Sequence, residues 1–446
     1  MGTGQTMKIC VFGLWHLGSV IASCLAEKGF EVVGLDSDSN RIKDLQKGIP
    51  PIFEPGLEDL IKKSLANKKL VFTTDEKIAL DKTNIVWVAF DTPVDEADRA
   101  DVDYVIDRVK KLFVHLESGM IVLISSQLPV RSTRQLQDDF FKQYPKKKLI
   151  FAYSPENLRL GRAIESFTKP ERIVVGLRNN QGKEKLEAIF KLYCNNIEWM
   201  SVESAEMTKH GLNAFLATSI SFINELAILC EKVGADAREV ERGLKSDPRI
   251  GIKSYLKAGA AFAGGTLARD VVFLDTIGRL LSISTPLITA VNVSNQEHKM
   301  WSLNKLRTEL GNLNDKTVAV LGLTYKPGTN TLRRSSSIEL CENLVKYGVI
   351  IKCHDPSLKK LPKDYEEKFN FSSSITDTLK GAEALVVATE WPDYKTLSID
   401  DILQNMRKPI VIDANRFLDK NLGEDQRICY FAVGRPLKTE GYPKCN

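Results

Sequence analysis

Short runs of apolar residues between residue 7 and about residue 200 constrain the fold of this 446-residue chain more than any other feature. Each run is continuously apolar, and helical patterns separate the runs. A strand that is apolar on both faces is typical of a parallel sheet covered by helices on both sides. The first part of the chain is therefore predicted to be a doubly wound α/β domain. The runs are KICVFG, EVVGLD, NIVWVAF, MIVLISS, LIFAYS and RIVVG.

The stretch from about Ser204 to Trp301 has no comparable strand, and its apolar residues recur at helical spacing. We expect an all-helical segment here, with one apolar side buried. The residues expected on that buried side are Phe215, Ile220, Phe222, Ile223 and Leu226.

The strand pattern then begins again with TVAVLGL, IIKCHD, ALVVATE and PIVIDAN. Since KICVFGL and TVAVLGL are alike, we expect two similar sheets rather than one long sheet. The predicted fold class is α/β, with two Rossmann-like doubly wound parallel-sheet domains joined by a central all-helical domain. The predicted domain boundaries are 7–203, 204–312 and 313–446.

Composition narrows the class of protein. A hydrophobic content of 43% and a charged content of 27% are those of a soluble globular protein, and a net charge of +5 lacks the clustered basicity of a nucleic-acid binder. No apolar run approaches the ~18 residues that a membrane span needs. The chain also starts without the charged-then-apolar layout of a secretory signal. We therefore expect a cytoplasmic protein that binds neither nucleic acid nor membrane.

The eight cysteines are scattered and show no CxxC spacing. This pattern indicates reduced thiols, not a disulfide framework or a zinc site, and no metal is expected. The cysteines lie at positions 10, 24, 194, 230, 341, 353, 429 and 445.

The first β-rich run opens a βαβ unit that is typical of dinucleotide binding. Gly13 and Gly18 occupy the outer positions of G-x-G-x-x-G, and Asp36 follows the second strand at the place of a ribose-binding acid. An acid there favours NAD over NADP, because it repels a 2′-phosphate. The middle glycine is replaced by Trp15, which should crowd the pyrophosphate or change the local path. The alternative is a doubly wound domain that has lost its ligand.

Many further segments carry a specific resemblance, and they occur in one consistent order along the chain. They are EPGLEDLI, FDTPVDEADRADVDYV, SPENLRLGRAI, KHGLNAFLATSISFINELA, DPRIG, AFAGGTLARD, VLGLTYKPGTNTLRRSSSIEL, HDP, ATEW and VIDANRFLD. From Met7 to about Pro436 the chain resembles the UDP-glucose/GDP-mannose dehydrogenase family of nucleotide-sugar dehydrogenases. The resemblance implies an N-terminal NAD domain, a central helical domain that dimerises, and a C-terminal domain that holds the nucleotide diphosphate.

The resemblance also implies a reaction. Such enzymes oxidise the C6 alcohol of the sugar twice with two NAD⁺, and a cysteine adds to the intermediate aldehyde. A lysine and an asparagine hold the developing oxyanion, and an aspartate orders a water molecule. A fixed cation and an amide donor lower the barrier because negative charge grows on one oxygen. The implied substrate is a UDP-sugar, with UDP-glucose as the default, and the implied assembly is a homodimer or a higher homo-oligomer.

Carried over residue by residue, the resemblance assigns roles to individual positions. The lysine and asparagine fall on Lys209 and Asn213, which are four residues apart and hence on one face of a helix. Arg249 matches an arginine that reaches the sugar across the dimer interface, and Lys326 and Arg333 match groups near the nucleotide diphosphate. The candidate catalytic residues are Lys209, Asn213, Asp270, Glu156 and Thr266; the cofactor-binding candidates are Gly13, Trp15, His16, Leu17, Gly18, Asp36, Thr92, Pro93, Gln127, Arg269 and Arg333; and the substrate-binding candidates are Glu156, Asn157, Leu158, Lys209, Asn213, Arg249, Tyr255, Gly259, Phe262, Gly264, Tyr325 and Lys326.

Several of these positions also have purely structural interpretations. Lys209 would ordinarily be a solvated charge, Asn213 an interhelical hydrogen-bond partner, and Glu156 a cap or an ion-pair partner. Asp270 follows Arg269 at a helix start, where the helix dipole favours a carboxylate. Arg333 would ordinarily form a surface ion pair.

The chain departs from the family pattern at the nucleophile, because Thr266 stands where the family has cysteine. A thiol ionises near pH 8.5 and a hydroxyl far higher, so Thr266 could attack only with a base beside it. Three outcomes remain open. The enzyme stops at a 6-aldehyde; it oxidises the hydrated aldehyde directly, with Glu156 or Asp270 as the base; or it works on another carbon.

A hypothesis from another class is a non-catalytic nucleotide-sugar binder or regulatory homologue. Five departures from the family pattern surround the two ligands: Trp15, Asp91, Gln127, Leu160 and Thr266. Against this hypothesis, decay would not be expected to spare Lys209, Asn213 and Asp270 together. We therefore favour NAD-dependent oxidation of a UDP-sugar.

Overall fold

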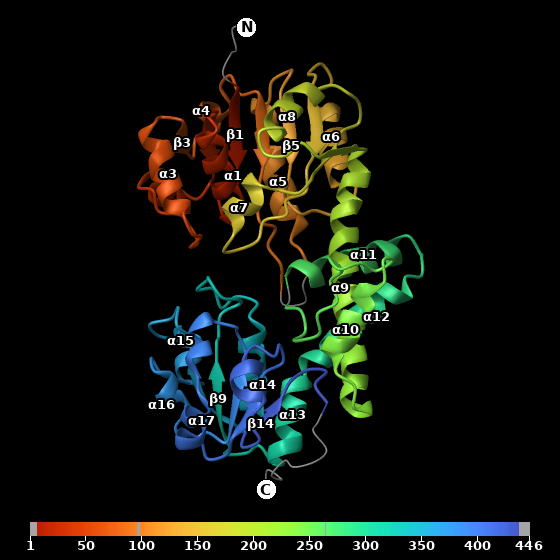
Figure 1. The fold of residues 1–446 in the computed structure, drawn as a ribbon. Helices are drawn as coiled ribbons and strands as arrows, with labels where there is room; N and C mark the ends of the chain where they lie inside the picture. The colour runs from red at the N-terminus through yellow and green to blue at the C-terminus, as the bar shows by residue number, and fades with distance from the viewer. Residues whose placement is uncertain (1–6, 96–98, 264, 437–446) are drawn as a thin grey trace. The chain divides into compact units, whose positions relative to one another are not determined.

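The computed structural model describes residues 7–95, 99–263 and 265–436. The chain forms two units, which meet in the sequence at Gly211 and Leu212. Each unit contains one sheet with helices packed on it (Figure 1). The fold is therefore the α/β class that the apolar runs predicted.

The sheet of the N-terminal unit has the strand order β3-β2-β1-β4-β5-β6-β7-β8. Its strands run parallel except for β6 and β7, which pair antiparallel through Tyr153 and Gly176. The expectation of a wholly parallel sheet is therefore wrong at this one pair. The strands are β1 (Lys8–Phe12), β2 (Glu31–Leu35), β3 (Leu70–Thr73), β4 (Ile85–Val88), β5 (Ile121–Ile124), β6 (Ile150–Tyr153), β7 (Ile173–Gly176) and β8 (Ile197–Met200).

Helices cover both faces of this sheet, and alternate residues of β1 show it. Ile9 and Val11 belong to a core with helices α1, α3, α7 and α8, while Cys10 and Phe12 belong to a second core with α5 and α6. Burial on both faces explains why the strand is continuously apolar. The helices are α1 (His16–Glu27), α2 (Ser39–Gln46), α3 (Leu57–Ala66), α4 (Glu76–Leu80), α5 (Val102–Leu112), η1 (Phe113–His115), α6 (Ser132–Gln143), α7 (Ala163–Thr168) and α8 (Lys183–Phe190).

The second unit contains a smaller sheet with the order β11-β10-β9-β12-β13-β14. All of its described strand pairs are parallel. The strands are β9 (Thr317–Leu321), β10 (Ile350–His354), β11 (Asn370–Phe371), β12 (Ala384–Val387), β13 (Ile410–Ile412) and β14 (Cys429–Phe431). The helices around it are α14 (Ser336–Lys346), α15 (Lys363–Glu366), α16 (Ile375–Leu379), η2 (Pro392–Thr396), α17 (Ile399–Asn405) and η3 (Asp419–Gly423).

The two sheets begin in the same way, as the likeness of KICVFGL and TVAVLGL predicted. Gly13 after β1 has φ +95°, and Gly322 after β9 has φ +91°. The backbone N–H of Leu14 donates to Asp36, and that of Leu323 donates to Asp355, both at 2.8 Å. In each case a carboxylate at the end of the second strand holds the turn that follows the first strand.

Helices alone make up the stretch between the two sheets, as expected. Ala217, Phe262, Val271 and Val291 join α9, α11 and α12 in one small core. The predicted buried side of α9 is only partly correct, because Ile223 is buried whereas Phe215 and Phe222 are 66% and 53% exposed. The helices are α9 (Val202–Val233), α10 (Ala237–Ser246), α11 (Thr266–Leu280), α12 (Pro286–Lys299) and α13 (Trp301–Leu310).

The long helix α9 also corrects the expectation about apolar runs. By length and composition it could cross a membrane, and 39% of its most apolar 18-residue window is buried inside the protein. The core helix of a soluble protein passes the same test, so a single helix of this kind is weak evidence for a membrane span.

All ten strands expected from the sequence are present, and the four that were missed are β3, β8, β11 and β14. These are the edge strands of the two sheets. An edge strand is less buried or very short, so it leaves no continuous apolar run. Four-residue β3, for example, has an exposed Val71 between buried neighbours. The predicted domain boundaries stay a prediction.

Within residues 7–436 the described cysteines follow the expectation of reduced thiols with one exception, and Cys445 lies outside the described residues. Six of them are free, and burial raises the pKa of Cys10 and of Cys24 to about 12. Cys429 is disulfide-bonded, so the expectation is wrong at that position.

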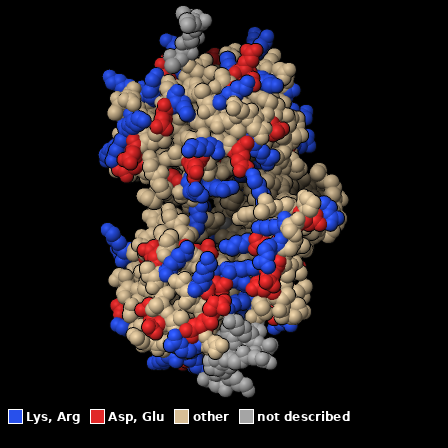
Figure 2. Space-filling view, viewed as in Figure 1, with Lys and Arg blue, Asp and Glu red and all other residues tan. Residues whose placement is uncertain are grey.

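On the face of the molecule seen in Figure 2, basic and acidic side chains are interspersed, in keeping with the small net charge.

Candidate active site

The turn between β1 and α1 has the close packing that a dinucleotide needs. A Cβ on Gly18 would lie 1.7 Å from the carbonyl oxygen of Gly13, and a Cβ on Gly13 would lie 2.7 Å from the ring of Phe90. Gly13 also has φ +95°, which side chains disfavour. The helix therefore starts as close to the strand as the backbone allows, which is how such a turn brings a phosphate to a helix N-terminus.

Asp36 lies directly after β2, where the sequence predicted it, and it is buried. One oxygen accepts from the N–H of Leu14, the other from the N–H of Asp38, at 2.8 and 2.9 Å. Arg41 donates to the first oxygen at 2.8 Å and was missed by sequence reasoning. The sequence signal that could have identified Arg41 is its position five residues after Asp36, on α2.

The indole of Trp15 lies against the guanidinium of Arg41, whose central carbon is 5.2 Å from the ring centroid. Trp15 is 39% exposed. The side chain at the middle glycine position thus stacks on the cation beside the ribose-binding acid, a contact that a glycine could not make.

A second buried carboxylate, Glu54, connects the cofactor turn to another loop. His16 Nε2 lies 3.0 Å from Glu54, which also accepts from the N–H groups of Gly161 and Ala163 at 2.8 Å each. Burial alone would raise the pKa of Glu54, but these hydrogen bonds outweigh it and hold the pKa below its usual value. Sequence reasoning quoted the EPGL segment without assigning Glu54 a role.

The remaining cofactor candidates of this unit lie beyond the carboxyl ends of β4 and β5. Thr92 is buried and donates to the carbonyl of Gln127 at 2.7 Å, and Pro93 follows it. Asp91 accepts from the N–H of Leu17, in the first turn of α1, at 3.3 Å. Strand order reverses between β1 and β4, and such a switch point is where open α/β sheets bind dinucleotides.

Lys209 lies on α9 with 5% of its side chain exposed, so it is not the solvated charge of the structural interpretation. Its ammonium donates to the carbonyl of Glu156 at 2.6 Å and to the side chain of Asn157 at 3.3 Å. The carboxylate of Glu156 lies 3.9 Å away and accepts from the N–H of Leu158. The loop after β6 therefore holds a buried cation.

Asn213 follows one turn later on α9, and its amide donates to Asp270 on α11. Asn213 is 5% exposed and Asp270 is fully buried. Arg269 is half-buried beside it. Burying a charge is costly unless specific partners compensate it. Because Asp270 is fully buried and accepts from the amide of Asn213, it is not the solvated helix-start carboxylate of the structural interpretation.

The segment before α11 is held by three asparagines that sequence reasoning did not single out. Asn224 accepts from the N–H of Gly259 at 3.0 Å, and Asn295 bonds both the N–H and the carbonyl of Phe262. Asn415 accepts from the N–H of Ala260 at 2.8 Å. A Cβ on Gly259 would lie 2.2 Å from the Asn415 oxygen, so a side chain there would displace the amide that holds Ala260.

Thr266 is the first residue of α11 and is exposed, after Gly265 with φ +104°. Gly264 lies outside the described residues. Two cysteines, Cys230 and Cys194, are the candidates for a thiol that could approach this loop in space. Cys230 packs in the core of the second sheet, and burial raises its pKa. Cys194 donates to the carbonyl of Asn196. Neither arrangement resembles an activated nucleophile.

The other substrate candidates lie in less enclosed positions. Arg249 is 87% exposed and forms a double ion pair with Asp247, and Tyr255 is also exposed. Tyr325 begins a loop closed by its N–H bond to the carbonyl of Thr331, and Lys326 is half-buried in that loop. Arg333 is exposed, and its N–H donates to the hydroxyl of Thr331.

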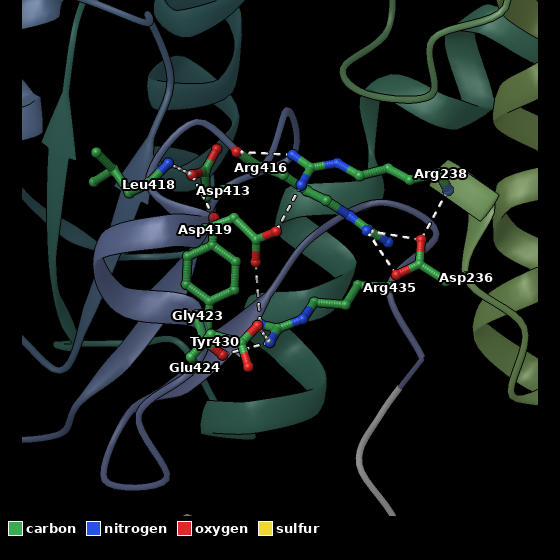
Figure 3. Close-up of polar contacts among 10 residues, drawn as sticks. All are labelled: Asp236, Arg238, Asp413, Arg416, Leu418, Asp419, Gly423, Glu424, Tyr430 and Arg435. Carbon is green, nitrogen blue, oxygen red and sulfur yellow. Dashed lines mark hydrogen bonds and ion pairs between the residues drawn. The ribbon is translucent and has the colours of Figure 1, made fainter. Parts of the chain in front are cut away.

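The VIDANRFLD segment brings a buried arginine that sequence reasoning did not single out (Figure 3). Arg416 has a 5% exposed side chain, and one terminal nitrogen donates to both oxygens of Asp236 at 2.8 and 2.9 Å. Asp236 also caps α10, and Arg238 on that helix bonds Asp419 and the carbonyl of Arg416. Among the described residues, Nε and Nη2 of Arg416 have no hydrogen-bond partner.

A close glycine turn, a buried acid after β2 at a switch point and a buried lysine are the arrangement expected of a nucleotide-dependent dehydrogenase. Family models agree with this class over most of the chain. The UDP-glucose/GDP-mannose dehydrogenase family matches with its NAD binding domain at residues 7–194, its central domain at 203–297 and its UDP binding domain at 319–420.

Similar proteins span the same length. The chain is 32% identical to UDP-glucose 6-dehydrogenase TuaD of Bacillus subtilis, covering 96% of this chain and 93% of that protein. It is 34% identical to UDP-glucose 6-dehydrogenase of Rickettsia felis, covering 97% of each. The solved structure of a UDP-glucose dehydrogenase from Pyrobaculum islandicum is 29% identical, with a TM-score of 0.85 over 93% of this chain and 95% of that one.

The chain therefore belongs to the UDP-glucose/GDP-mannose dehydrogenase family. It is an NAD-dependent oxidoreductase that acts on a CH–OH group of a nucleotide sugar, and it binds NAD and a UDP-sugar. The expectation that the cofactor is NAD is confirmed, whereas the roles given to Gly13, Gly18 and Asp36 stay a prediction.

Proposed function

We propose that the protein oxidises the C6 hydroxyl of a UDP-sugar, with UDP-glucose as the default substrate, without forming a cysteine thioester. The observation that carries this proposal is that Lys209, Asn213 and Asp270 are buried, whereas Thr266, at the position where the resemblance implies a cysteine, is exposed. Similarity to proteins named UDP-glucose 6-dehydrogenase supports the choice of carbon and sugar.

When bound, NAD⁺ would supply the acceptor for a hydride from the sugar carbon. The ammonium of Lys209 and the amide of Asn213 stabilise the negative charge on the sugar oxygen as its proton passes to a water molecule, which Asp270 orders in the role that the resemblance implies. If a second step follows, water adds to the aldehyde, and the resulting diol loses a hydride to a second NAD⁺ and a proton to Glu156 or Asp270. This route reaches the acid without a covalent enzyme intermediate.

The test counts NADH per sugar and compares the wild type with Thr266→Ala. We expect Thr266→Ala to keep its rate within about threefold, because a hydroxyl is a poor nucleophile without an activating base. Two equivalents of NADH per sugar indicate the acid, and one indicates an aldehyde or a ketone. A loss of more than a hundredfold in the variant would show that Thr266 takes part in the chemistry, against the proposal.

A second candidate function is a non-catalytic nucleotide-sugar binder. Trp15 and Asp91 favour it, since both place side chains at the cofactor turn where the family has glycine. Binding of a UDP-sugar without any NADH formation over a panel of UDP- and GDP-sugars would support this candidate.

A basic cavity within the second unit supports a place for the nucleotide diphosphate. The cavity has a volume of about 550 Å³, and Arg416, nine-tenths buried, lines it with Lys257. Three further basic residues of its wall lie on α10: Arg238, Arg242 and Lys245. We propose that this cavity holds negative charge of the substrate, together with the Tyr325–Lys326 loop and Arg333.

The proposed assembly is a homodimer through the central helices. Phe215, Phe222 and Leu229 follow each other at intervals of seven residues on α9 and are all more than half exposed. Seven residues are about two helical turns, so the three form one apolar stripe. The exposed Arg249 suits the cross-subunit role that the resemblance implies. A cytoplasmic location is part of the same proposal.

Replacing Phe222 by aspartate is expected to give monomers, because a charge in an apolar interface is not compensated. Sedimentation equilibrium measures the mass of the variant. Leu192→Asp, which places the same charge at an exposed apolar residue outside the central helices, is the matched control and should leave the oligomer intact. A dimeric Phe222→Asp protein would contradict this choice of surface.

A further inference from the structure

The first turn of α1 is capped by a residue from a different strand. Asp91, three residues beyond the end of β4, accepts from the N–H of Leu17 although the two are 74 positions apart in the sequence. The N-cap residue itself, Trp15, makes no side-chain capping bond, and the first turn contains no acidic residue. The carboxylate that faces this helix start therefore comes from outside the helix.

Some helices of the protein supply their own caps, whereas others, such as α3, α6 and α8, have no side-chain cap. Asp38 caps α2, Asp75 caps α4, and Ser335 caps α14. A dinucleotide-binding helix ordinarily leaves its first N–H groups and the positive end of its dipole to the ligand's pyrophosphate. In α1 the carboxylate of Asp91 accepts from one of those groups, the N–H of Leu17.

Two further carboxylates contact the same turn and add to the negative charge around it. Consecutive parts of the segment Leu14–Leu17 contact three carboxylates: Leu14 contacts Asp36, His16 contacts Glu54, and Leu17 contacts Asp91. Arg41 donates a hydrogen bond to Asp36, and Nε2 of His16 lies within hydrogen-bonding distance of Glu54. Asp36 has a role in ribose recognition and Glu54 braces the loop at Gly161, whereas Asp91 is bonded to the helix N-terminus itself.

We propose that Asp91 competes, within the molecule, with the pyrophosphate of NAD for the N-terminus of α1 and thereby weakens cofactor binding. To bind, the dinucleotide must displace this carboxylate, and the two negative groups repel each other at close range. The pyrophosphate is common to NAD⁺ and NADH, so both are held weakly, and reduced cofactor leaves readily. The inference rests on the placement of the pyrophosphate at α1, and it does not depend on which sugar is oxidised.

The test measures the binding of NAD⁺ and of NADH by calorimetry in the absence of sugar, so it is independent of any catalytic activity. Asp91→Asn keeps the size of the side chain and removes its charge, and Asp91→Gly removes the side chain. We expect the dissociation constants of both cofactors to fall about tenfold in both variants, which corresponds to about 1.4 kcal/mol. Asp95→Asn is the matched control, since Asp95 lies in the same loop and bonds Arg99 instead of α1.

A second measurement uses thermal unfolding. Without cofactor, Asp91→Asn should unfold at a slightly lower temperature than the wild type, because the helix start loses an anionic partner. With saturating NAD⁺ the order should reverse. Equal or weaker NAD⁺ binding by Asp91→Asn, an equal gain in Asp95→Asn, or no binding by any of the forms would each overturn the proposal.

Discussion

Replacing Lys209 by methionine is expected to lower kcat by at least about a hundredfold, in line with the loss of a single preorganised oxyanion partner. Methionine keeps the length and apolar stem of the side chain and removes only the cation. The ammonium of Lys209 is buried and held by Glu156 and Asn157, so it is fixed before the substrate arrives. The measurement is steady-state NADH formation with UDP-glucose, with KM and kcat determined separately.

The control for this experiment is Lys232→Met, which removes an exposed lysine from the same helix α9. Its kcat should match the wild type. NAD⁺ binding measured by calorimetry should also be unchanged in Lys209→Met, because the proposed role concerns the sugar oxygen. Full activity of Lys209→Met would remove the main support for the proposed mechanism.

Replacing Gly18 by alanine is expected to weaken NAD⁺ binding by more than about a hundredfold. The added Cβ would lie 1.7 Å from the carbonyl oxygen of Gly13, so α1 and the β1 turn must move apart. That contact is with backbone, which yields less easily than a flexible side chain, and overpacking of this kind costs about 1–3 kcal/mol of stability. The helix start then leaves the position in which its N–H groups meet the pyrophosphate.

Calorimetry with NAD⁺ measures the loss of cofactor binding, and chemical denaturation measures the loss of stability. Gly243→Ala is the matched control, because Gly243 lies inside α10 and an added Cβ there would meet nothing within 4 Å. That variant should be more stable than the wild type by up to about 1 kcal/mol and should bind NAD⁺ normally. If Gly18→Ala bound NAD⁺ normally, the pyrophosphate would have to bind elsewhere.

The cofactor end of the protein was largely predictable because its signals are local. Gly13, Gly18 and Asp36 lie within one βαβ unit, and their spacing follows from the lengths of two strands and a helix. The likeness of KICVFGL and TVAVLGL predicted the two similar sheets for the same reason. Burial on α9 was less predictable, since helical periodicity locates an apolar face but does not say whether the core or a partner covers it. Phe222, for example, belongs to the predicted buried face of α9 but is exposed in the structure.

Contacts between distant segments left no signal in the sequence. Glu54 holds the N–H of Gly161 across 107 positions, and Asn415 holds Ala260 across 155 positions. Each side chain satisfies backbone groups of a loop, and many asparagines or glutamates elsewhere in the chain have the same chemistry. The pairing depends on the path of the chain between them, so only the folded structure reveals it.

The amino-acid sequence by itself determined the class of the fold, the positions of the ten inner strands along the chain, and the glycine turn after the first strand, because these depend on periodicity and on spacing over a few tens of residues. Only the tertiary structure decided that Lys209 and Asp270 are buried, that Arg416 is held by Asp236, and that Asp91 caps α1. Such contacts depend on which strand ends meet at one edge of a sheet, and long-range packing sets that arrangement.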